Sequence, residues 1–267
     1  MTRALHSVLI AATATLGLAF APRLRSQDAQ SCLPFGPGEQ LKYSVRAATM
    51  GAKGETRMWV SGPEVIRGRS VIVLRSEASV GVAFFRGSDR SASWIDPVKF
   101  AALRFTQTER HLIGRITDSV EIYPDERRWE RSNNRAGTLS SNAPLDVLSY
   151  IYLLRTLPLG TDSTWTFNRH VDAARNPTSV HVIGLDSITT PAGAFQVWNV
   201  EMRVRDTDHY DREGVIKVLI STDSQRIPVR IQSVMPTAGT TVMTLASITR
   251  GTGSNCPLFA AGRAPTR

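Results

Sequence analysis

Hydrophobic and polar residues alternate with a period of two along most of this chain. Leu41, Tyr43 and Val45 alternate with polar residues, which places one face of a strand in a core and the other in water. The strands expected from such stretches lie at residues 41–47, 56–60, 70–79, 101–108, 113–123, 164–169, 180–185, 200–205, 215–221, 229–234 and 241–248. The pattern is that of an antiparallel β protein.

One segment has helical periodicity instead. Apolar residues recur every three or four positions between Leu145 and Leu154, which is the spacing of one helix face. Asn142 or Ser141 is expected to cap its start, and the helix is expected to end before Pro158. The predicted helix spans about residues 143–156.

The connections between the strands are short and rich in turn residues. Residues 190–193 and 223–226 both look like hairpin turns, and the chain contains no internal repeat and no linker. We therefore expect one mainly β domain over residues 30–257, followed by a flexible tail at 258–267. Its expected architecture is a curved antiparallel sheet, or half-barrel, with the single helix packed on it or closing it.

The first 21 residues read as a secretory signal peptide. Arg3 and His6 precede an apolar run over residues 8–20, and Ala19-Phe20-Ala21 has the small residues of a cleavage site. Pro22 fits poorly after such a cut, so cleavage as late as residue 29 is the alternative. The run is too short for a membrane span, and no second one follows. The mature chain is expected to be periplasmic or secreted.

Cys32 and Cys256 bracket nearly all of the mature chain. In an oxidising compartment a lone pair of cysteines favours a disulfide, and loop-entropy models give so long a loop about 4–5 kcal/mol of stabilisation. Two unpaired thiols at the chain ends are the alternative.

Composition and charge exclude some classes of function. With 42% hydrophobic and 21% charged residues the chain is an ordinary globular mixture. The net charge is +9, but the arginines are scattered through strand-like segments rather than gathered in a block. Scattered arginines and an exported address together argue against a nucleic-acid partner.

No catalytic or metal-binding motif stands out. The histidines His111, His170, His181 and His209 lack metal-ligand spacing, and no serine lies in a nucleophile elbow. The acidic residues Asp206, Asp208, Asp211 and Glu213 lack the pattern of a calcium-binding EF-hand loop and are better read as a solvated hairpin tip. No metal or cofactor is therefore expected.

The aromatic residues leave two interpretations open. They can belong to the core, or they can line a ligand cavity that suits a lipid or another amphiphile. The residues concerned are Trp59, Phe84, Phe85, Trp94, Trp129, Trp165 and Trp198.

Several motifs resemble one family. Residues 34–43, Pro-Phe-Gly-Pro-Gly-Glu-Gln-Leu-Lys-Tyr, look like the opening signature of the exported bacterial family called domain of unknown function 3108. Residues 146–159 are similar to its helix motif, 193–195 to the motif that follows, and 221–230 to its hairpin motif. Thr222 departs from the acidic residue often found there.

The resemblance runs from residue 34 to about 248 and implies an exported, mostly β domain. Such a domain would be akin to the half-barrels of lipoprotein carriers, in which a curved sheet wraps an apolar cavity, but the family supplies no active site. The residues that carry the matches are Phe35, Gly38, Glu39, Tyr43, Asp146, Tyr152, Arg155, Asp223, Arg226 and Pro228.

Three of these residues also have readings that need no family. Gly38 can supply a positive φ before the first strand. Pro228 fits the start or edge of a strand, or a bulge. Glu39 can be a ligand-binding carboxylate or a hydrogen-bond partner for turn amides.

Two functions remain open from the sequence. The first, which we favour, is a non-enzymatic envelope protein that binds a hydrophobic or amphiphilic ligand or an envelope component. The second is a cell-wall or polysaccharide hydrolase whose carboxylates, such as Asp118, Glu121 or Glu201, are brought together only by the fold.

Overall fold

The computed structural model describes residues 33–48, 51–82, 85–111, 114–206, 212–235 and 239–252. The predicted signal peptide, both cysteines and the predicted C-terminal tail lie outside these residues. The same is true of Phe84, Asp208, His209 and Asp211.

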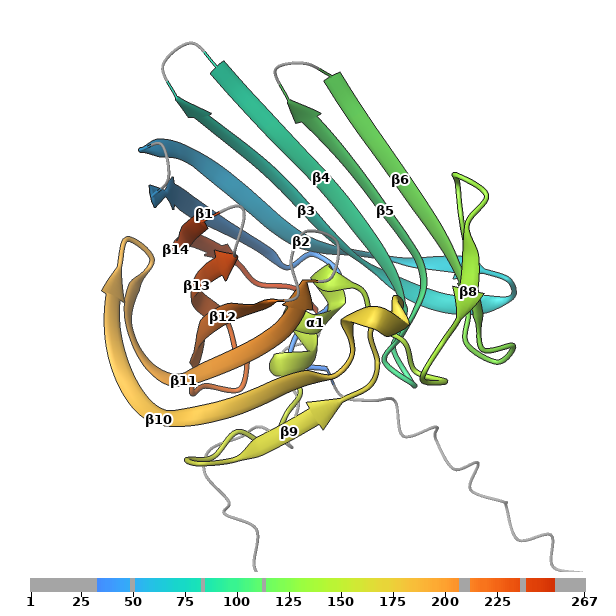
Figure 1. Cartoon of the computed structure of the whole chain (residues 1–267). Helices are drawn as coiled ribbons and strands as arrows, with labels where there is room; N and C mark the ends of the chain where they lie inside the picture. Colours follow the sequence, from blue (N-terminus) through green and yellow to red (C-terminus); the bar gives the residue numbers. More distant parts are fainter. Residues whose placement is uncertain are drawn as a thin grey trace, which may run out of the picture. The chain divides into compact units, whose positions relative to one another are not determined.

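The described residues form fourteen strands, one α-helix and one short 3-10 helix (Figure 1). In chain order these are β1 (Gln40–Ala47), β2 (Ala52–Ile66), β3 (Arg69–Val82), β4 (Phe85–Asp96), β5 (Ala101–His111), β6 (Gly114–Tyr123), β7 (Arg128–Arg131), β8 (Ala136–Thr138), α1 (Val147–Leu154), β9 (Thr164–Phe167), η2 (Ala173–Arg175), β10 (Thr178–Thr190), β11 (Gly193–Asp206), β12 (Arg212–Ser221), β13 (Pro228–Met235) and β14 (Gly239–Thr249).

All fourteen strands belong to one antiparallel sheet. Its order is β8-β7-β6-β5-β4-β3-β2-β1-β14-β13-β12-β11-β10-β9, so each strand up to β8 pairs with its neighbour in sequence, as does each from β9 onward. The exception is the pairing of β1 with β14, from Gln40 opposite Thr249 to Ala47 opposite Thr241. The first and last strands therefore lie side by side in the middle of the sheet, and the two open edges are β8 and β9.

The α-helix lies within the curve of this sheet, as predicted (Figure 1). It contacts β3 and β4, and all its residues except Val147 are buried. We call β1–β8 the N-terminal half of the sheet and β9–β14 its C-terminal half. One hydrophobic core joins the helix to strands of both halves, for example through Leu74 and Val200. The sheet thus wraps the helix, and we call the side of the sheet that faces α1 its inner face.

The helix begins four residues later than predicted. Asp146, rather than Asn142 or Ser141, is its N-cap, because the Asp146 carboxylate accepts hydrogen bonds from the backbone amides of Leu148 and Ser149 at 3.0 and 2.9 Å. The Ser149 hydroxyl accepts from the Asp146 amide in return and completes a capping box.

The predicted strands and turns are confirmed, but three strands of the sheet were not predicted. The turns at 190–193 and 223–226 connect β10 to β11 and β12 to β13. Gly38 has a φ of +92°, and β13 begins at Pro228 beside a register shift. The omission is β4, together with the short strands β7 and β8, because β4 contains few hydrophobic residues.

Candidate functional site

Several residues of the family-like motifs meet in one buried cluster. The Arg155 guanidinium donates from Nη1 to Glu39 Oε1 at 2.6 Å and from Nη2 to Glu39 Oε2 at 2.8 Å. Arg155 is fully buried and Glu39 nearly so. Arg155 Nη2 also donates to the backbone carbonyl of Gln225 at 2.9 Å. The end of α1, the start of β1 and the β12–β13 turn are therefore joined through one side chain.

Aromatic rings surround this ion pair. The Arg155 guanidinium lies 4.6 Å from the centroid of the Phe35 ring, and Phe35 packs edge-on against Tyr152. Burial alone would lower the pKa of the Arg155 guanidinium, but the Glu39 carboxylate outweighs it, and the pKa is raised. Arg155 therefore stays charged, and the Glu39 carboxylate is occupied by it rather than by turn amides.

The remaining motif residues bind backbone groups. The Tyr43 hydroxyl donates to the Pro228 carbonyl at 2.8 Å, and burial raises the pKa of that hydroxyl. Asp223 accepts from the amides of Gln225 and Arg226 at 2.9 and 3.1 Å, which shapes the β12–β13 turn. This cluster, with Asp146 at the helix cap, builds the fold, and its two carboxylates and the Tyr43 hydroxyl are engaged with other parts of the chain.

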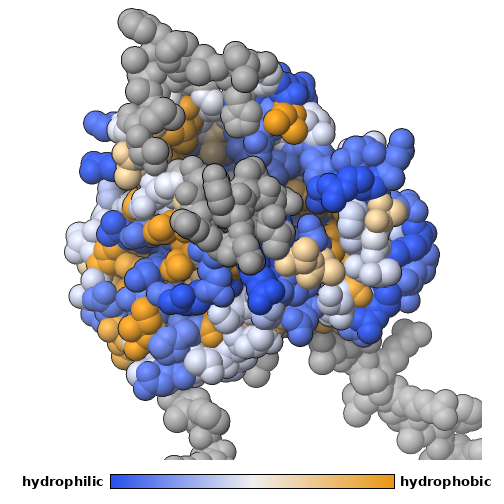
Figure 2. Space-filling model, in the orientation of Figure 1, coloured by the Kyte–Doolittle hydropathy of each residue, from blue (hydrophilic) through white to orange (hydrophobic). Residues whose placement is uncertain are grey.

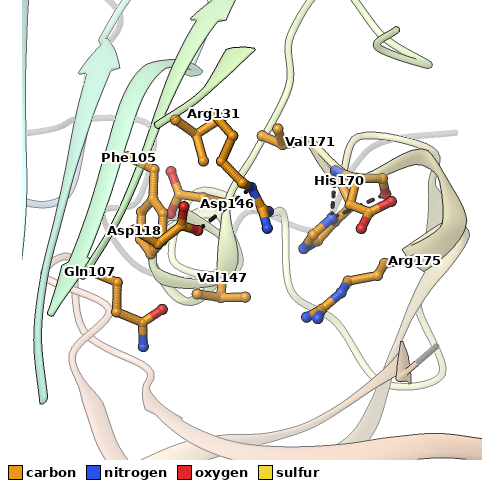
Figure 3. A pocket seen from close by; sticks show the side chains of 11 residues that line it. Phe105, Gln107, Asp118, Arg131, Asp146, Val147, His170, Val171 and Arg175 are labelled. Atoms are coloured by element: carbon orange, nitrogen blue, oxygen red, sulfur yellow. Dashed lines mark hydrogen bonds and ion pairs between the residues drawn. The ribbon is translucent and has the colours of Figure 1, made fainter. Parts of the chain in front are cut away.

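A separate pocket opens beside the start of α1. It has a volume of about 140 Å³ and lies between β5, β6, β7, the first helical residue and the segment that leads into η2 (Figure 3). Its lining residues are Phe105, Gln107, Asp118, Val120, Arg131, Asp146, Val147, His170, Val171, Asp172 and Arg175. We call it the helix-cap pocket.

Both acidic and basic side chains line the helix-cap pocket. In Figure 3 Asp118 and Arg131 point toward each other, with Asp118 Oδ2 lying 3.6 Å from Arg131 Nε. Asp172 accepts from the Ala174 amide at 3.0 Å and so caps η2. Asp146 caps α1 and also accepts a hydrogen bond from the buried Ser93 hydroxyl. Each carboxylate therefore has an internal partner.

His170 is the most strongly perturbed group in this pocket. Burial and, to a smaller extent, the nearby Arg175 guanidinium lower the pKa of its imidazole to about 4. The imidazole is thus neutral at pH 7. Its Nδ1 lies 3.0 Å from the Asp172 amide nitrogen and 3.2 Å from the Asp172 carbonyl oxygen, so either tautomer of the neutral ring has a partner there. Burial raises the pKa of the Asp146 carboxyl.

The carboxylates considered for hydrolysis lie apart. Asp118 lines the pocket, whereas Glu121, three residues further along β6, pairs on the outer face with Arg67 at 2.8 Å. Glu201 pairs with Arg203 at 2.8 Å on β11. Because side chains alternate across a strand, an odd spacing such as that between Asp118 and Glu121 places them on opposite faces.

The other candidate residues are dispersed. His181 lies opposite Glu201 in the β10–β11 pairing, His111 lies at the end of β5, and Glu213 pairs with Arg203 at 3.5 Å. Within the described ranges no three His, Cys, Asp or Glu side chains come together in a metal-binding arrangement.

The described tryptophans belong to two environments. Trp129 is buried in the core, and Trp165 and Trp198 pack against it. Trp59 and Trp94 lie beneath guanidinium groups, with that of Arg57 4.1 Å from the Trp59 ring centroid. None of them lines the helix-cap pocket.

Sequence reasoning did not single out Gln107, Arg131, Asp172 or Arg175. Asp172 had a local signal, because aspartate before Ala-Ala-Arg is a typical helix cap. The others had none, since their meeting depends on strand register and on a parallel bridge between Leu145 and His170. A second, more open hollow of about 290 Å³ lies on the β10–β11 hairpin between Ser187 and Gln196.

Comparison with known proteins gives a family and a fold. The family model described as protein of unknown function, DUF3108, matches residues 42–246. No curated protein matches the chain. A β-barrel-like protein of domain of unknown function DUF1849 from Brucella abortus has a similar structure, with 11% identity, a TM-score of 0.54, and coverage of 82% of this chain and 99% of its own.

Two further structures are more distant. One is a candidate exported protein with a YmcC-like fold from Bacteroides fragilis, with 12% identity, a TM-score of 0.34, and coverage of 83% of this chain and 100% of its own. The other is a candidate lipoprotein from Parabacteroides distasonis, with 12% identity, a TM-score of 0.33, and coverage of 84% and 100%. Scores this low do not support an argument about function.

Proposed function

We propose that this chain, which belongs to the DUF3108 family of proteins of unknown function, is an exported, non-enzymatic binding protein for an amphiphilic envelope component. The observation that carries the proposal is the helix-cap pocket, which opens beside the polar strands β5 and β6 of an inner face that is mostly apolar on β11–β14.

The polar side is formed by β3, β4, β5 and β6. Beyond the residues that α1 covers, the cross-strand pairs Ser76–Ser91 and Asp89–Glu109 and then Gln107–Asp118 lie on the inner face. Ser76 and Gln107 lie two residues beyond the core residues Leu74 and Phe105 on the same strands, and therefore on the same face of the sheet. The Gln107 amide donates to Asp89 at 2.6 Å and to Glu109 at 2.9 Å. We call this side the polar wall, and it leads into the pocket through Gln107 and Asp118.

The apolar side is formed by β11, β12, β13 and β14. At the rim of the core its inner face carries Val204, Ile216, Met235 and Met243, all half-buried, with Ser233 and Thr241 as the polar residues among them. We call this side the apolar wall. A ligand with a polar group and a hydrocarbon part would find a surface for each on the same inner face.

The state of the acidic groups favours binding over catalysis. A general acid or base needs a carboxyl group that is free to exchange protons with a substrate. In the helix-cap pocket Asp146 and Asp172 are held as caps, which leaves Asp118, 3.6 Å from Arg131 Nε, as a single carboxylate where glycoside hydrolysis uses a pair. The neutral His170 with its lowered pKa is better suited to form a hydrogen bond than to take up a proton at pH 7.

Export and the Cys32–Cys256 disulfide are part of the same proposal. The Thr252 amide donates to the Pro37 carbonyl at 3.0 Å, so the two ends of the domain meet within a few residues of each cysteine. Extended chain spans about 3.3–3.6 Å per residue, and the intervening residues are enough for the two sulfurs to meet. Free-thiol titration of the unfolded, unreduced protein checks this, and two free thiols would contradict it.

The test of binding is native mass spectrometry of the protein, produced with its own leader and recovered from the envelope. We expect a population with added mass that corresponds to a co-purified amphiphile. Val147→Trp, which narrows the helix-cap pocket from an exposed position on α1, should remove this population. Val65→Trp is the matched control, because Val65 is 74% exposed and lies away from the pocket. A clean apo mass from wild-type protein would contradict the proposal.

In the described part of the chain, no helix combines the length and apolar character that a membrane span requires.

A further inference from the structure

We infer that the polar group held in the helix-cap pocket is neutral and polyhydroxylated, as in a sugar unit, rather than an ionised head group. This inference rests on the proposed function and specifies its ligand. It follows from the balance of charge in the pocket, from its unused hydrogen-bonding groups, and from its size.

Charges of both signs line the pocket at close quarters. An anionic head group such as a phosphate would meet Asp118 and Asp172, and on approach it would pass Asp89 and Glu109 of the polar wall. A cationic head group would meet Arg131 and Arg175. Either ion would lose its hydration and would then lie beside lining groups of the same charge. Both effects lower the affinity of the pocket for an ionised head group.

A hydroxyl group fits both kinds of lining group. Each hydroxyl can donate one hydrogen bond and accept two, so it can bridge a carboxylate and a guanidinium without adding charge. The Asp118 carboxylate and the Arg131 guanidinium both line the pocket, and at 3.6 Å their contact is longer than a hydrogen bond. The neutral His170 imidazole also lines the pocket and offers one further donor or acceptor at Nε2. A neighbouring pair of hydroxyls would engage Asp118 and His170 together.

The size of the pocket limits it to one small unit. A volume of about 140 Å³ is smaller than the 300–1,000 Å³ of pockets that enclose a drug-sized ligand. The remainder of the ligand must lie outside, along the inner face, where the apolar wall can cover it.

The experiment measures binding of three probes to the full-length mature protein. They are a neutral monoglucosyl diacylglycerol, phosphatidic acid with the same acyl chains, and free methyl glucoside. Both lipids are presented in the same neutral detergent micelles. We expect the glucosyl lipid to bind about tenfold or more tightly than phosphatidic acid, a ratio that one or two lost hydrogen bonds produce.

Asp118→Asn gives a readout that a purely structural role would not produce. Removing one negative charge should weaken glucosyl lipid binding severalfold and strengthen phosphatidic acid binding, so that the two affinities change in opposite directions. Asp125→Asn is the matched control, because Asp125 is exposed and pairs with Lys99 on the outer surface. If Asp118→Asn fails to fold, Val147→Trp is the second variant and should weaken glucosyl lipid binding alone.

The outcomes separate the inference from the proposed function. Tighter binding of phosphatidic acid by the wild type would overturn the inference and leave the binding function standing. Binding of neither lipid nor sugar would overturn both. Methyl glucoside binding as tightly as the glucosyl lipid would support the hydroxylated group and identify a free saccharide as its source, which would contradict the role of the apolar wall.

Discussion

The polar wall and the apolar wall share one sheet, one helix and one strand geometry, yet their inner faces differ. Where α1 covers them both are apolar, as Leu74 on β3 and Val200 on β11 illustrate. Beyond the helix the polar wall presents Ser91 and Glu109, whereas the apolar wall presents Ile216 and Met243. Residues packed against the helix are apolar because they are buried there. Residues beyond the helix do not have this constraint, so their side chains can be those that a ligand requires.

The outer surfaces of the two halves differ as well. On the N-terminal half, arginines, carboxylates and aromatic rings alternate across neighbouring strands, as where Glu77 pairs with both Arg57 and Arg90. On the C-terminal half, β10 exposes Ile183 and Leu185. Figure 2 shows the same contrast, with a mostly hydrophilic surface over β6 to β8 and several hydrophobic patches over β10 and β11. The N-terminal half nevertheless also exposes single apolar residues, namely Val65, Val98 and, on the inner face of β6, Ile116.

The largest expected effect comes from breaking the ion pair that joins the two halves. Arg155→Met removes the cation and leaves the Glu39 carboxylate buried and unpaired. We expect the free energy of unfolding to fall by about 3–5 kcal/mol, as measured by urea denaturation. The double variant Glu39→Gln with Arg155→Met should recover part of this loss, because no isolated charge remains.

Arg203→Met is the matched control for this variant. It removes an ion pair with Glu201 from an exposed arginine on β11, and exposed pairs contribute about 0–1 kcal/mol. Equal losses in Arg155→Met and Arg203→Met would mean that the buried pair does not hold the halves together.

A smaller effect is expected from pH, acting through His170 between the two halves. The unfolded imidazole takes up a proton near pH 6.5, whereas the folded one does so only near pH 4. Between these values the unfolded chain binds more protons, so stability falls as the pH drops. From pH 7 to pH 5 the contribution of His170 amounts to about 2 kcal/mol.

His170→Asn isolates this contribution in urea denaturation at the two pH values. Asp146, whose pKa is raised by burial, titrates alike in both proteins and cancels in the comparison. The wild type should lose about 2 kcal/mol more than the variant between pH 7 and pH 5. An identical pH dependence in the two proteins would contradict a neutral, buried His170.

The apolar wall can be tested by making it polar. Met243→Gln places an amide on the half-buried inner face of β14, and we expect it to cost about 1 kcal/mol of stability. It should weaken glucosyl lipid binding severalfold and leave methyl glucoside binding unchanged. Val234→Gln is the control, because Val234 lies on the outer face of β13 and is 40% exposed. Loss of lipid binding in both variants would remove the distinction between the faces.

The smallest effect is expected on the outer surface of the N-terminal half. Glu77→Gln removes the carboxylate shared by Arg57 and Arg90. Since exposed ion pairs are weak and screened by salt, the loss should be below about 1 kcal/mol at low ionic strength and should disappear at 1 M salt. If the loss of stability persisted at high salt, Glu77 would contribute through side-chain packing and not through its ion pairs.

The same contrast explains what the sequence could predict. Alternation identified the strands that have an apolar inner face, including β1 and β12. It missed β4 because Gly87, Asp89 and Ser91 occupy the inner face there and Arg90 the outer one, so no hydrophobic period remains. The helix start was displaced because Leu145 pairs with His170 instead of joining the helix.

The candidate site was only partly predictable. Asp118 was named as a candidate, but its odd spacing from Glu121 already implied opposite faces of one strand. Its actual neighbours, Arg131 and His170, come from β7 and from the segment before η2. Their proximity depends on strand register and loop packing, which no local pattern encodes.

The pairing of β1 with β14 has a kinetic consequence for a chain that is synthesised from its N-terminus. The β1–β2 hairpin can form early, but the other edge of β1 has no partner until the last strand has been made. Contacts between the two ends of a chain make folding slow, and an unpaired central strand invites association with another molecule. A chain interrupted before β14 would therefore leave this edge of β1 unpaired in the middle of the sheet, so productive folding requires the whole domain.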